Sequence, residues 1–412
     1  MPERLKKISE FIKSNLDLVG VLDGKEAFKG PEMLHIDLTN RCNNQCLACW
    51  CRSPLLKDKC MPPEEQVKTL PYEIIKGILD DAYSMGTRQV KFVGGGEPFM
   101  HPEVMKLVEY AVKKGYSIDI NTNFTLVNEE AAKKFVDLGV DLMTVSLWAA
   151  TPKTYVATHA NQTGKTFQNI EKVLNFITRY KKETGKTKPA IKLYNVIFNK
   201  NYKEINRMID FAFSTGSEAV QFTVMDPKEG STDSLLLNNK EQDFLIKEIE
   251  KAKKRINFLS QTISKKGYEN QVFVSSFQEF ERRVKSEKAG SGMYDEKVTC
   301  SIPCSAGWMF SRIMADGNVV PCLKGPLKPV GNVYKKRFRQ IWEGKKQKEF
   351  RYNGTHLSRT NPYFAQLNCL KTCDNLWQNE SIYIRLTSLS KSQRRILKGA
   401  GFMLKIKKAF KN

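Results

Sequence analysis

The chain has 412 residues, 41% of them hydrophobic, and a formal net charge of +23. This length is typical of two or three domains, and the chain contains no run of about 18 apolar residues, the length that spans a membrane as a helix. The N-terminal segment MPERLKKISEFIKSNLDLVG carries scattered charges instead of the apolar stretch of a secretory signal, so we expect a cytoplasmic protein.

Ten cysteines and the basic balance narrow the classes of function further. In a reducing compartment, cysteines are expected to be metal ligands or core thiols rather than disulfides. A charge of +23 is typical of proteins that meet nucleic acid, an anionic membrane surface or an anionic substrate. The distribution of the charge has to decide among these three partners.

Residues 1–32 are predicted to form an N-terminal extension, an amphipathic helix followed by a loop. Segments rich in Val, Ile, Phe and Tyr then recur with helical periodicity between them, which predicts βα units and a parallel sheet. The expected strands are 34–40, 89–95, 117–123, 141–148, 191–199 and 219–226. Helices are predicted over 71–86 and 102–115, because each begins with Pro and ends with Gly. We therefore expect an α/β fold, a partial (β/α)6 barrel, over 33–228.

The rest of the chain divides where its composition changes. Residues 229–299 are polar with helical periodicity and contain no motif, so we expect a helical connector. Residues 300–378 hold the later cysteines and are predicted to form a small C-terminal domain. In residues 379–412 basic and apolar side chains alternate with helical spacing, which suits an anionic membrane surface; a solvated, disordered tail is the alternative.

Three cysteines lie within eight positions in RCNNQCLACW, directly after the first expected strand: Cys42, Cys46 and Cys49. Loops at the C-terminal ends of barrel strands carry the chemistry of such folds. Structural zinc prefers a closed set of four ligands, so a zinc knuckle is the weaker alternative. Three thiolates on one short loop instead suit a cubane iron–sulfur cluster that is held at three irons and left open at the fourth.

A glycine-rich turn, VGGGEPFMHP at 93–102, follows the second expected strand. Glycines let the backbone approach a ligand closely, and Glu97 supplies an acid beside them. Such turns are common, so the turn alone is a weak indication of a site.

A second set of cysteines lies near the C-terminus. In CSAGWMFSRIMADGNVVPC, a hairpin turning at Asp316-Gly317 would bring Cys304 close to Cys322. The segment NCLKTCDN adds Cys369 and Cys373. Four thiolates can close around a cubane cluster, and a four-cysteine zinc site is the alternative.

C-x3-C-x2-C followed by an aromatic residue, here Trp50, resembles the radical S-adenosylmethionine (SAM) family. The resemblance implies a [4Fe–4S] cluster on Cys42, Cys46 and Cys49 whose open iron binds SAM. It also implies reductive cleavage of SAM to a 5′-deoxyadenosyl radical that abstracts hydrogen. The glycine-rich turn matches the family's GGEP motif, which hydrogen-bonds the SAM amino group, at Gly95, Gly96, Glu97 and Pro98. Further SAM contacts are implied at strand ends, where ordinary capping is the alternative: Asn121, Asn123, Ser146, Asn195 and Met225.

The later cysteines resemble the auxiliary-cluster domain called SPASM, or its shorter form called twitch, whose shared opening is C-x9–15-G-x4-C. Residues 331–344 also resemble the stretch that follows this opening. The resemblance implies one auxiliary [4Fe–4S] cluster, held by four ligands: Cys304, Cys322, Cys369 and Cys373. Cys300 is a spare thiol that would replace Cys369 or Cys373, remain free, or donate hydrogen to a substrate radical. Cys51 and Cys60 are interpreted as packing thiols.

His159 lies in the polar loop ATPKTYVATHANQTG. We interpret it as a substrate contact or an acid–base group above the barrel mouth, with a surface histidine as the alternative.

Two clusters indicate a route for a second electron, and so an oxidation of two electrons or an epimerisation. Only about 33 residues precede the first strand, too few for a leader-binding fold with its own core, so we expect a non-peptide substrate: a sugar, an aminocyclitol or a lipid-linked saccharide. A peptide-modifying maturase is the first alternative and an RNA-modifying enzyme the second. The barrel shows no basic–aromatic interleaving, so we do not expect a nucleic-acid partner. The expected partners are an electron donor such as flavodoxin or ferredoxin and, through the tail, an anionic membrane surface.

Overall fold

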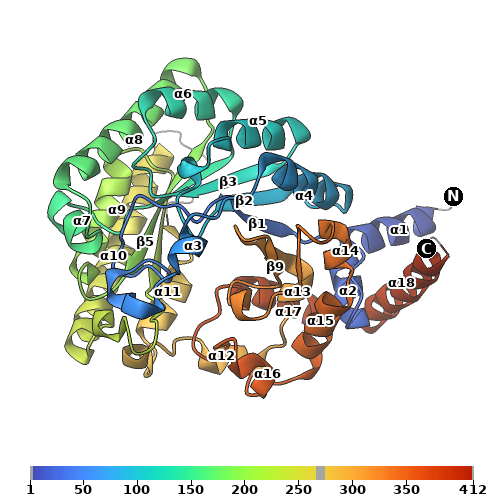
Figure 1. The fold of residues 1–412 in the computed structure, drawn as a ribbon. Helices are drawn as coiled ribbons and strands as arrows, with labels where there is room; N and C mark the ends of the chain where they lie inside the picture. The colour runs from blue at the N-terminus through green and yellow to red at the C-terminus, as the bar shows by residue number, and fades with distance from the viewer. Residues whose placement is uncertain (1–2, 266–273, 411–412) are drawn as a thin grey trace. The chain divides into compact units, whose positions relative to one another are not determined.

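The computed structural model describes residues 3–265 and 274–410. The chain forms two compact units. Unit 1 comprises Met1–Ile36, Leu70–Val90 and Asp295–Asn412, and unit 2 comprises Asp37–Thr69 and Lys91–Tyr294. Both units combine helices and strands, as the sequence predicted for an α/β fold (Figure 1). None of the helices in the described ranges is both long and apolar enough to cross a membrane.

Unit 2 is built on a parallel sheet in the order β3-β4-β5-β6-β7. Its strands are β3 (Ser117–Thr122), β4 (Leu142–Ser146), β5 (Ala190–Ile197), β6 (Ala219–Val224) and β7 (Val274–Ser275), and β2 (Gln89–Val93) enters the unit at residue 91. The six strands predicted from β-branched and aromatic residues are confirmed; each ends one to three residues earlier than predicted, and each start lies within one residue of the predicted one. On β5 every second residue is buried, which places Ile191, Leu193, Asn195 and Ile197 on one covered face.

Helices lie outside the strands of unit 2 (Figure 1). They are α5 (Val104–Lys114), α6 (Glu129–Leu138), α7 (Pro152–Thr158), α8 (Gly164–Thr184) and α9 (Ile205–Ser214). Their limits follow from local chemistry: α6 begins where the Asn128 side chain accepts from the Ala131 N–H, and ends at Gly139, whose φ of 72° suits glycine. The loops that follow the strands carry Glu97 after β2 and Asn123 after β3.

The stretch predicted to be a helical connector contains α10 (Asn239–Lys265), α11 (Phe277–Val284) and α12 (Glu296–Ser301). It also contains β7, which the prediction missed and which pairs in parallel with β6. A strand of two residues carries no detectable alternation, so its pairing depends on tertiary packing. Residues 266–273 of this stretch lie outside the described residues.

Unit 1 contains a mixed sheet in the order β10-β9-β8-β1. β1 (Met33–Asp37) runs parallel to β8 (Phe310–Ile313), which forms an antiparallel hairpin with β9 (Asn318–Val320), and β10 (Gly331–Asn332) pairs with β9. The predicted hairpin is therefore confirmed, and Gly317 in its turn has a φ of 83°. Helix α13 (Ala306–Met309) directly precedes β8, and the helices that follow β10 are α14 (Phe338–Trp342), α15 (Lys345–His356), α16 (Pro362–Ala365) and α17 (Leu376–Ser388).

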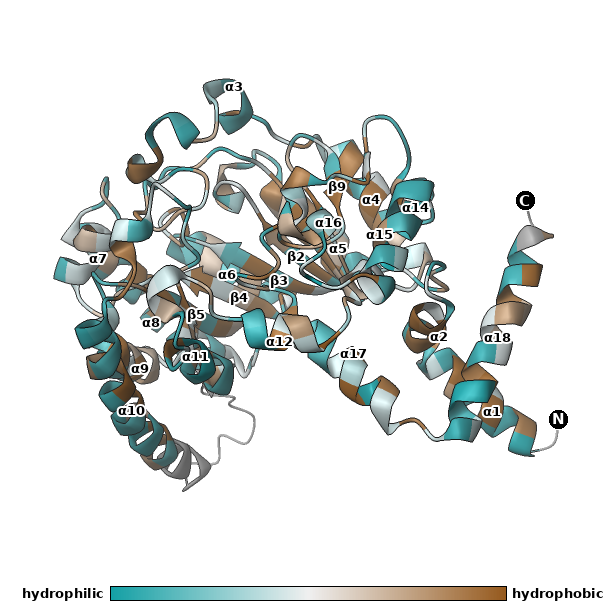
Figure 2. Ribbon diagram, turned by 90° about the horizontal axis from the view of Figure 1, so that it is seen from below, coloured by the Kyte–Doolittle hydropathy of each residue, from teal (hydrophilic) through white to brown (hydrophobic). Residues whose placement is uncertain are grey.

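The two ends of the chain pair within unit 1. The N-terminal extension forms two helices, α1 (Glu3–Ser14) and α2 (Leu16–Asp23), instead of one helix and a loop. The basic tail forms α18 (Lys391–Ala409), which starts at a capping box on Ser390 and packs against α2. Figure 2 shows hydrophobic and hydrophilic stretches alternating along α18. The alternative of a disordered tail is therefore wrong for residues 391–410; Lys411 lies outside the described residues.

Candidate functional site

The loop after β1 that carries Cys42, Cys46 and Cys49, here called the cysteine loop, is held by backbone pairing with the segment after α7. Leu47 N–H donates to the Thr158 carbonyl at 3.0 Å, and Ala160 N–H donates to the Gln45 carbonyl at 3.1 Å. These two bonds make a short antiparallel bridge between Cys46 and His159. The position of the middle cysteine is therefore fixed by main-chain geometry.

Two amides of the same segment fix the first half of the cysteine loop. The Asn161 side chain donates to the Asn43 carbonyl at 2.8 Å and accepts from Gln45 N–H at 2.8 Å. The Gln162 side chain donates to the Asn44 side chain at 2.7 Å. These contacts join residues more than 100 positions apart, and sequence reasoning missed both amides because a polar loop gives no sign of its partner.

The three thiols of the cysteine loop share one electrostatic environment. Burial raises the pKa of Cys42 to about 11 and that of Cys46 well above its ordinary value, and in both cases the nearby Cys49 raises it further. The pKa of Cys49 is lowered to about 6, chiefly by a hydrogen bond from Cys51, whose sulfur lies 3.7 Å away. Three partly buried thiolates this close repel one another unless a cationic centre joins them, and iron in a cluster supplies that charge.

The glycine turn passes so close to the cysteine loop that side chains are excluded. A Cβ on Gly96 would lie 2.0 Å from the Arg41 carbonyl oxygen, and one on Gly95 would lie 2.4 Å from the Asn40 side-chain oxygen. Glu97 N–H donates to the Arg41 carbonyl at 2.7 Å, which ties the end of the turn to the same loop. The glycines are needed for this approach of two backbones.

The Glu97 carboxylate joins the glycine turn to the end of β3. It is 2% exposed and accepts from Thr122 Oγ1 at 2.7 Å, Asn123 N–H at 2.7 Å and Phe99 N–H at 3.1 Å. Burial raises the pKa of Glu97 to about 7, although these three hydrogen bonds oppose the rise. The side chain thus supports the turn, and Pro98 starts the short helix that continues it.

The polar residues expected at strand ends have different surroundings. The Asn123 amide donates to Asn43 Oδ1 at 2.9 Å, so this residue links β3 to the cysteine loop. Asn195 is 1% exposed in an otherwise apolar strand face, and its side-chain oxygen has no hydrogen-bond partner; Asn121 Oδ1 is likewise buried and unpaired. Ser146 ends β4 and is partly buried. An unpaired buried amide is costly, and a polar ligand would satisfy it.

Met225 belongs to an apolar cluster instead of an open binding surface. Its side chain is buried with Trp148, Phe198 and Leu235, and the cysteine-loop residues Cys46, Leu47 and Ala48 pack against the cluster. The Met225 side chain therefore lies in the apolar cluster against which the cysteine loop packs. A contact of its backbone with adenine stays a prediction.

His159 is 1% exposed, so the alternative of a surface histidine is wrong. Its ring stacks on Tyr155 with 4.3 Å between centroids, and Nδ1 lies 2.9 Å from Thr158 Oγ1. Burial lowers the pKa of His159 to about 4, so the ring is neutral at pH 7. The polar sequence around His159 suggested an exposed side chain, but the segment that carries His159 pairs with the cysteine loop at Cys46 and the ring is buried.

Four cysteines of unit 1, here called the auxiliary cysteines, come together from three separate segments: Cys304, Cys322, Cys369 and Cys373. Burial raises the pKa of Cys322 well above its ordinary value, and the other three thiols raise it further. Cys304, Cys322 and Cys369 pack with Phe350 and other apolar side chains in one cluster. The hairpin of β8 and β9 brings Cys322 close to Cys304, as predicted. The backbone at Cys373 is held by a hydrogen bond from its N–H to Asp295 Oδ2 at 2.8 Å.

A buried arginine accompanies the auxiliary cysteines. Arg359 is 5% exposed and stacks on Phe364, with 5.1 Å between the guanidinium carbon and the ring centroid. Its charge lowers the pKa of Cys369 and Cys373, which burial alone raises. Sequence reasoning missed Arg359, because nothing distinguishes it among 67 Lys and Arg residues.

Cys300 lies outside this group. It is exposed on α12, four positions before Cys304. Cys369 and Cys373 both lie among the auxiliary cysteines, so Cys300 is not required as a replacement for either.

Both donor sets fit iron–sulfur clusters. In the described part of the chain, no three His, Cys, Asp or Glu side chains already converge on one point as they would around a single metal ion. In a cubane each cysteine binds an iron of its own, so its ligands surround the cluster and do not converge. Three thiols beside a backbone-lined turn suit a cluster with a polar ligand, and four neighbouring thiols, three of them buried, suit a closed cluster.

Comparison with known proteins agrees with this assignment. The radical SAM superfamily domain matches residues 36–212, and the SPASM iron–sulfur cluster-binding domain matches residues 304–375. The tungsten-containing aldehyde ferredoxin oxidoreductase cofactor-modifying protein of Pyrococcus furiosus is 30% identical over 189 residues, which are 45% of this chain and 49% of that protein. This chain thus spans about half the length of that relative.

Two further similarities cover more of the chain. The AdoMet-dependent heme synthase of Methanosarcina barkeri is 23% identical over 326 residues, 76% of this chain and 82% of that protein. The crystal structure of Streptococcus suis SuiB bound to S-adenosylmethionine shares the fold, with a TM-score of 0.57 and 16% identity over 84% of this chain and 73% of that one. The chain therefore contains a radical SAM superfamily domain and a SPASM domain, which together imply a SAM-binding [4Fe–4S] cluster, SAM and auxiliary iron–sulfur clusters as cofactors.

Proposed function

We propose that this enzyme removes two electrons from a non-peptide substrate, a sugar, an aminocyclitol or a lipid-linked saccharide with a hydroxyl group on an abstractable C–H carbon. A hydrogen atom leaves the carbon, and one further electron and the hydroxyl proton then leave, so that a carbonyl forms. The observation that carries the proposal is the second set of cysteines, four thiols of which three are buried, which suits an electron acceptor. When bound, the clusters and SAM supply hydrogen abstraction and the acceptor for the second electron.

In this proposal the residues of each unit hold the cofactors in place. Cys42, Cys46 and Cys49 are the ligands of the SAM-binding cluster, and the auxiliary cysteines are the ligands of the acceptor. The backbone of Gly95 and Gly96 receives the SAM amino group, because side chains are excluded there. Asn195 is the polar group of β5 that remains to be satisfied by the bound ligand.

His159 is assigned a supporting role in place of proton transfer. A neutral, buried ring that stacks on Tyr155 stabilises the bridge to the cysteine loop. Its low pKa would make a protonated form scarce near pH 7.

Oxidation is preferred to epimerisation because the auxiliary site offers a destination for the electron, whereas Cys300, the thiol nominated as hydrogen donor, is exposed on α12. The non-peptide class is supported by two of the relatives, the cofactor-modifying protein and the heme synthase. The positive net charge suits a phosphorylated or lipid-bound saccharide. The first electron would come from a carrier such as flavodoxin or ferredoxin in the cytoplasm, where the ten free cysteines stay reduced.

The test is anaerobic incubation with SAM, a reductant and candidate substrates deuterated at the reacting carbon. The proposal is supported if deuterium from a saccharide appears in 5′-deoxyadenosine and the product is two mass units lighter than the unlabelled substrate. Transfer from a ribosomal peptide and from none of the saccharides would replace it with the peptide-maturase alternative. Cys300→Ser is the matched control, because oxidation should survive this change whereas thiol-dependent epimerisation should stop.

A further inference from the structure

Helix α18 presents one face to the protein and a second apolar face to solvent. Leu397, Ala400 and Gly401 are buried against the N-terminal helices. The opposite side of the last turns carries an exposed apolar row, here called the outer stripe: Phe402 (66% exposed), Met403 (55%), Ile406 (36%) and Phe410 (87%). Positions 402, 406 and 410 are spaced by four residues, so their side chains follow one line along the helix.

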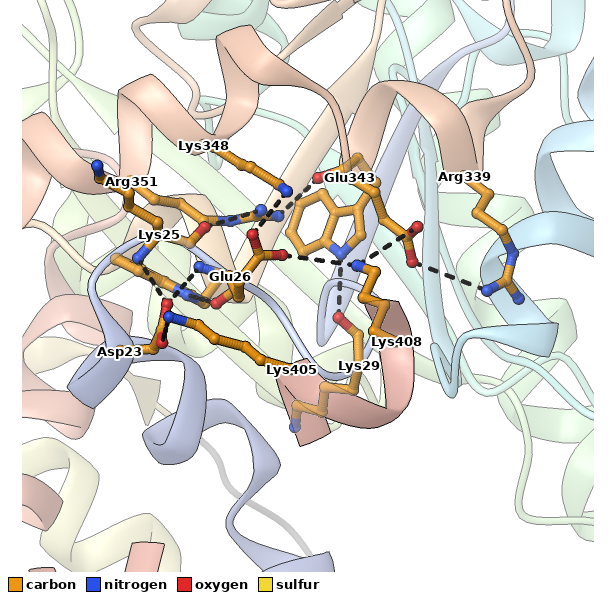
Figure 3. Close-up of polar contacts among 12 residues, drawn as sticks. Asp23, Lys25, Glu26, Lys29, Arg339, Glu343, Lys348, Arg351, Lys405 and Lys408 are labelled. Atoms are coloured by element: carbon orange, nitrogen blue, oxygen red, sulfur yellow. Dashed lines mark hydrogen bonds and ion pairs between the residues drawn. The ribbon is translucent and has the colours of Figure 1, made fainter. Parts of the chain in front are cut away.

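The orientation of α18 is fixed by ion pairs on its inner side. Lys405 pairs with Asp23, and Lys408 reaches Glu26 at 3.6 Å and Glu343 at 3.4 Å, as Figure 3 shows. Glu26 also binds Lys348 at 2.6 Å. These ion pairs hold Lys405 and Lys408 on the side of α18 that faces the protein. The outer stripe therefore cannot turn toward the protein unless the ion pairs break.

The surroundings of the outer stripe are basic. Lys391, Arg395, Lys398 and Lys407 are exposed on α18, and residues 381–412 contain no acidic residue. Exposed aromatic and aliphatic side chains bordered by lysine and arginine are typical of helices that lie in a membrane interface.

We propose that the outer stripe of α18 docks on an anionic phospholipid surface. The apolar side chains would enter the boundary between headgroups and acyl chains, and the bordering cations would contact the lipid phosphates. A second copy of the chain suits this face less well, because two such faces would bring four like charges from each copy together. A row of four side chains is also small beside the area that a stable protein interface buries. The proposal is independent of the substrate assigned above.

Vesicle flotation of the full-length holoenzyme tests the proposal. Wild type should float with vesicles of phosphatidylcholine and phosphatidylglycerol, should bind vesicles of phosphatidylcholine alone more weakly, and should detach as salt rises. The stripe variant carries Phe402→Ser, Met403→Ser, Ile406→Ser and Phe410→Ser, and its partition coefficient should fall roughly tenfold or more. Its thermal midpoint should match wild type, because the inner contacts remain.

Two matched variants separate the contributions. Lys391→Gln, Lys398→Gln and Lys407→Gln together should remove the preference for anionic vesicles. Leu126→Ser, Val156→Ser and Phe258→Ser, which change exposed apolar residues of unit 2, should leave flotation unchanged. Equal flotation of wild type and the stripe variant would overturn the proposal, as would a lack of wild-type binding to anionic vesicles. A wild-type dimer that the stripe variant converts to a monomer would assign the stripe to a second copy instead.

Discussion

Replacing Glu97 with glutamine should change the pH dependence of stability in a predictable direction. The carboxyl is 2% exposed, and burial raises its pKa from 4.5 to about 7. Between these values the folded chain keeps a proton that the unfolded chain releases, so the free energy of unfolding falls as pH rises through this window and levels off above it. Linkage gives a loss of about 2.5 kcal/mol between pH 5 and pH 8.

The substituted amide would not titrate, so the stability difference between wild type and Glu97→Gln should shift by about 2.5 kcal/mol against wild type over the same range. The variant also loses stability by the same amount at every pH, because the new side-chain NH2 would face Asn123 N–H and two hydrogen-bond donors would then meet. Urea denaturation of the cluster-free protein under anaerobic reducing conditions measures both terms, and Glu130→Gln on α6 controls for the loss of one exposed negative charge. A stability difference that is the same at pH 5 and pH 8, or that shifts in favour of wild type as the pH rises, would refute the reasoning.

Three further predictions concern the glycine turn and the auxiliary site. Gly96→Ala should abolish SAM binding in equilibrium dialysis, because its Cβ would overlap the Arg41 carbonyl. The control is Gly77→Ala in the middle of α4 (Tyr72–Ser84), where a Cβ meets open space, and this change should raise the free energy of unfolding by roughly 0.5–1 kcal/mol. Replacing all four auxiliary cysteines with Ala should remove about half of the iron and leave reductive SAM cleavage partly intact; zinc instead of iron at this site in the wild type would contradict the acceptor role. Arg359→Met should make the reduction potential of the auxiliary cluster more negative in an EPR-monitored titration, because a buried cation stabilises the reduced form. Arg359→Lys should largely preserve the potential, and equal potentials for the Arg359→Met variant and wild type would reject this role.

The strands and the cysteine motifs could be predicted from sequence because both depend on neighbouring residues. β-Branched runs recur with helices between them, and the Asp316-Gly317 turn specifies the hairpin that brings Cys322 to its partners. Spacing predicted Cys42, Cys46 and Cys49 as one ligand set, the resemblance to the radical SAM family implied a role for the glycine turn, and the structure places that turn against the cysteine loop.

The supports of the site could not be predicted, because they join distant segments. Asn161 and Gln162 hold the cysteine loop from across the chain, and the burial of His159 follows from that pairing. The helical pattern of the tail was visible, but its periodicity does not say which face packs on α2. The ion pairs of Lys405 and Lys408 decide that question.

The central claim is tested most directly by the triple variant Cys42→Ala, Cys46→Ala and Cys49→Ala. Wild-type protein isolated anaerobically should hold about eight iron atoms per chain from two cubane clusters and should form 5′-deoxyadenosine from SAM with a reductant. The variant should hold about half of that iron, all of it at the auxiliary site, and should form no 5′-deoxyadenosine. Continued SAM cleavage by the variant, or an unchanged iron content, would contradict the account.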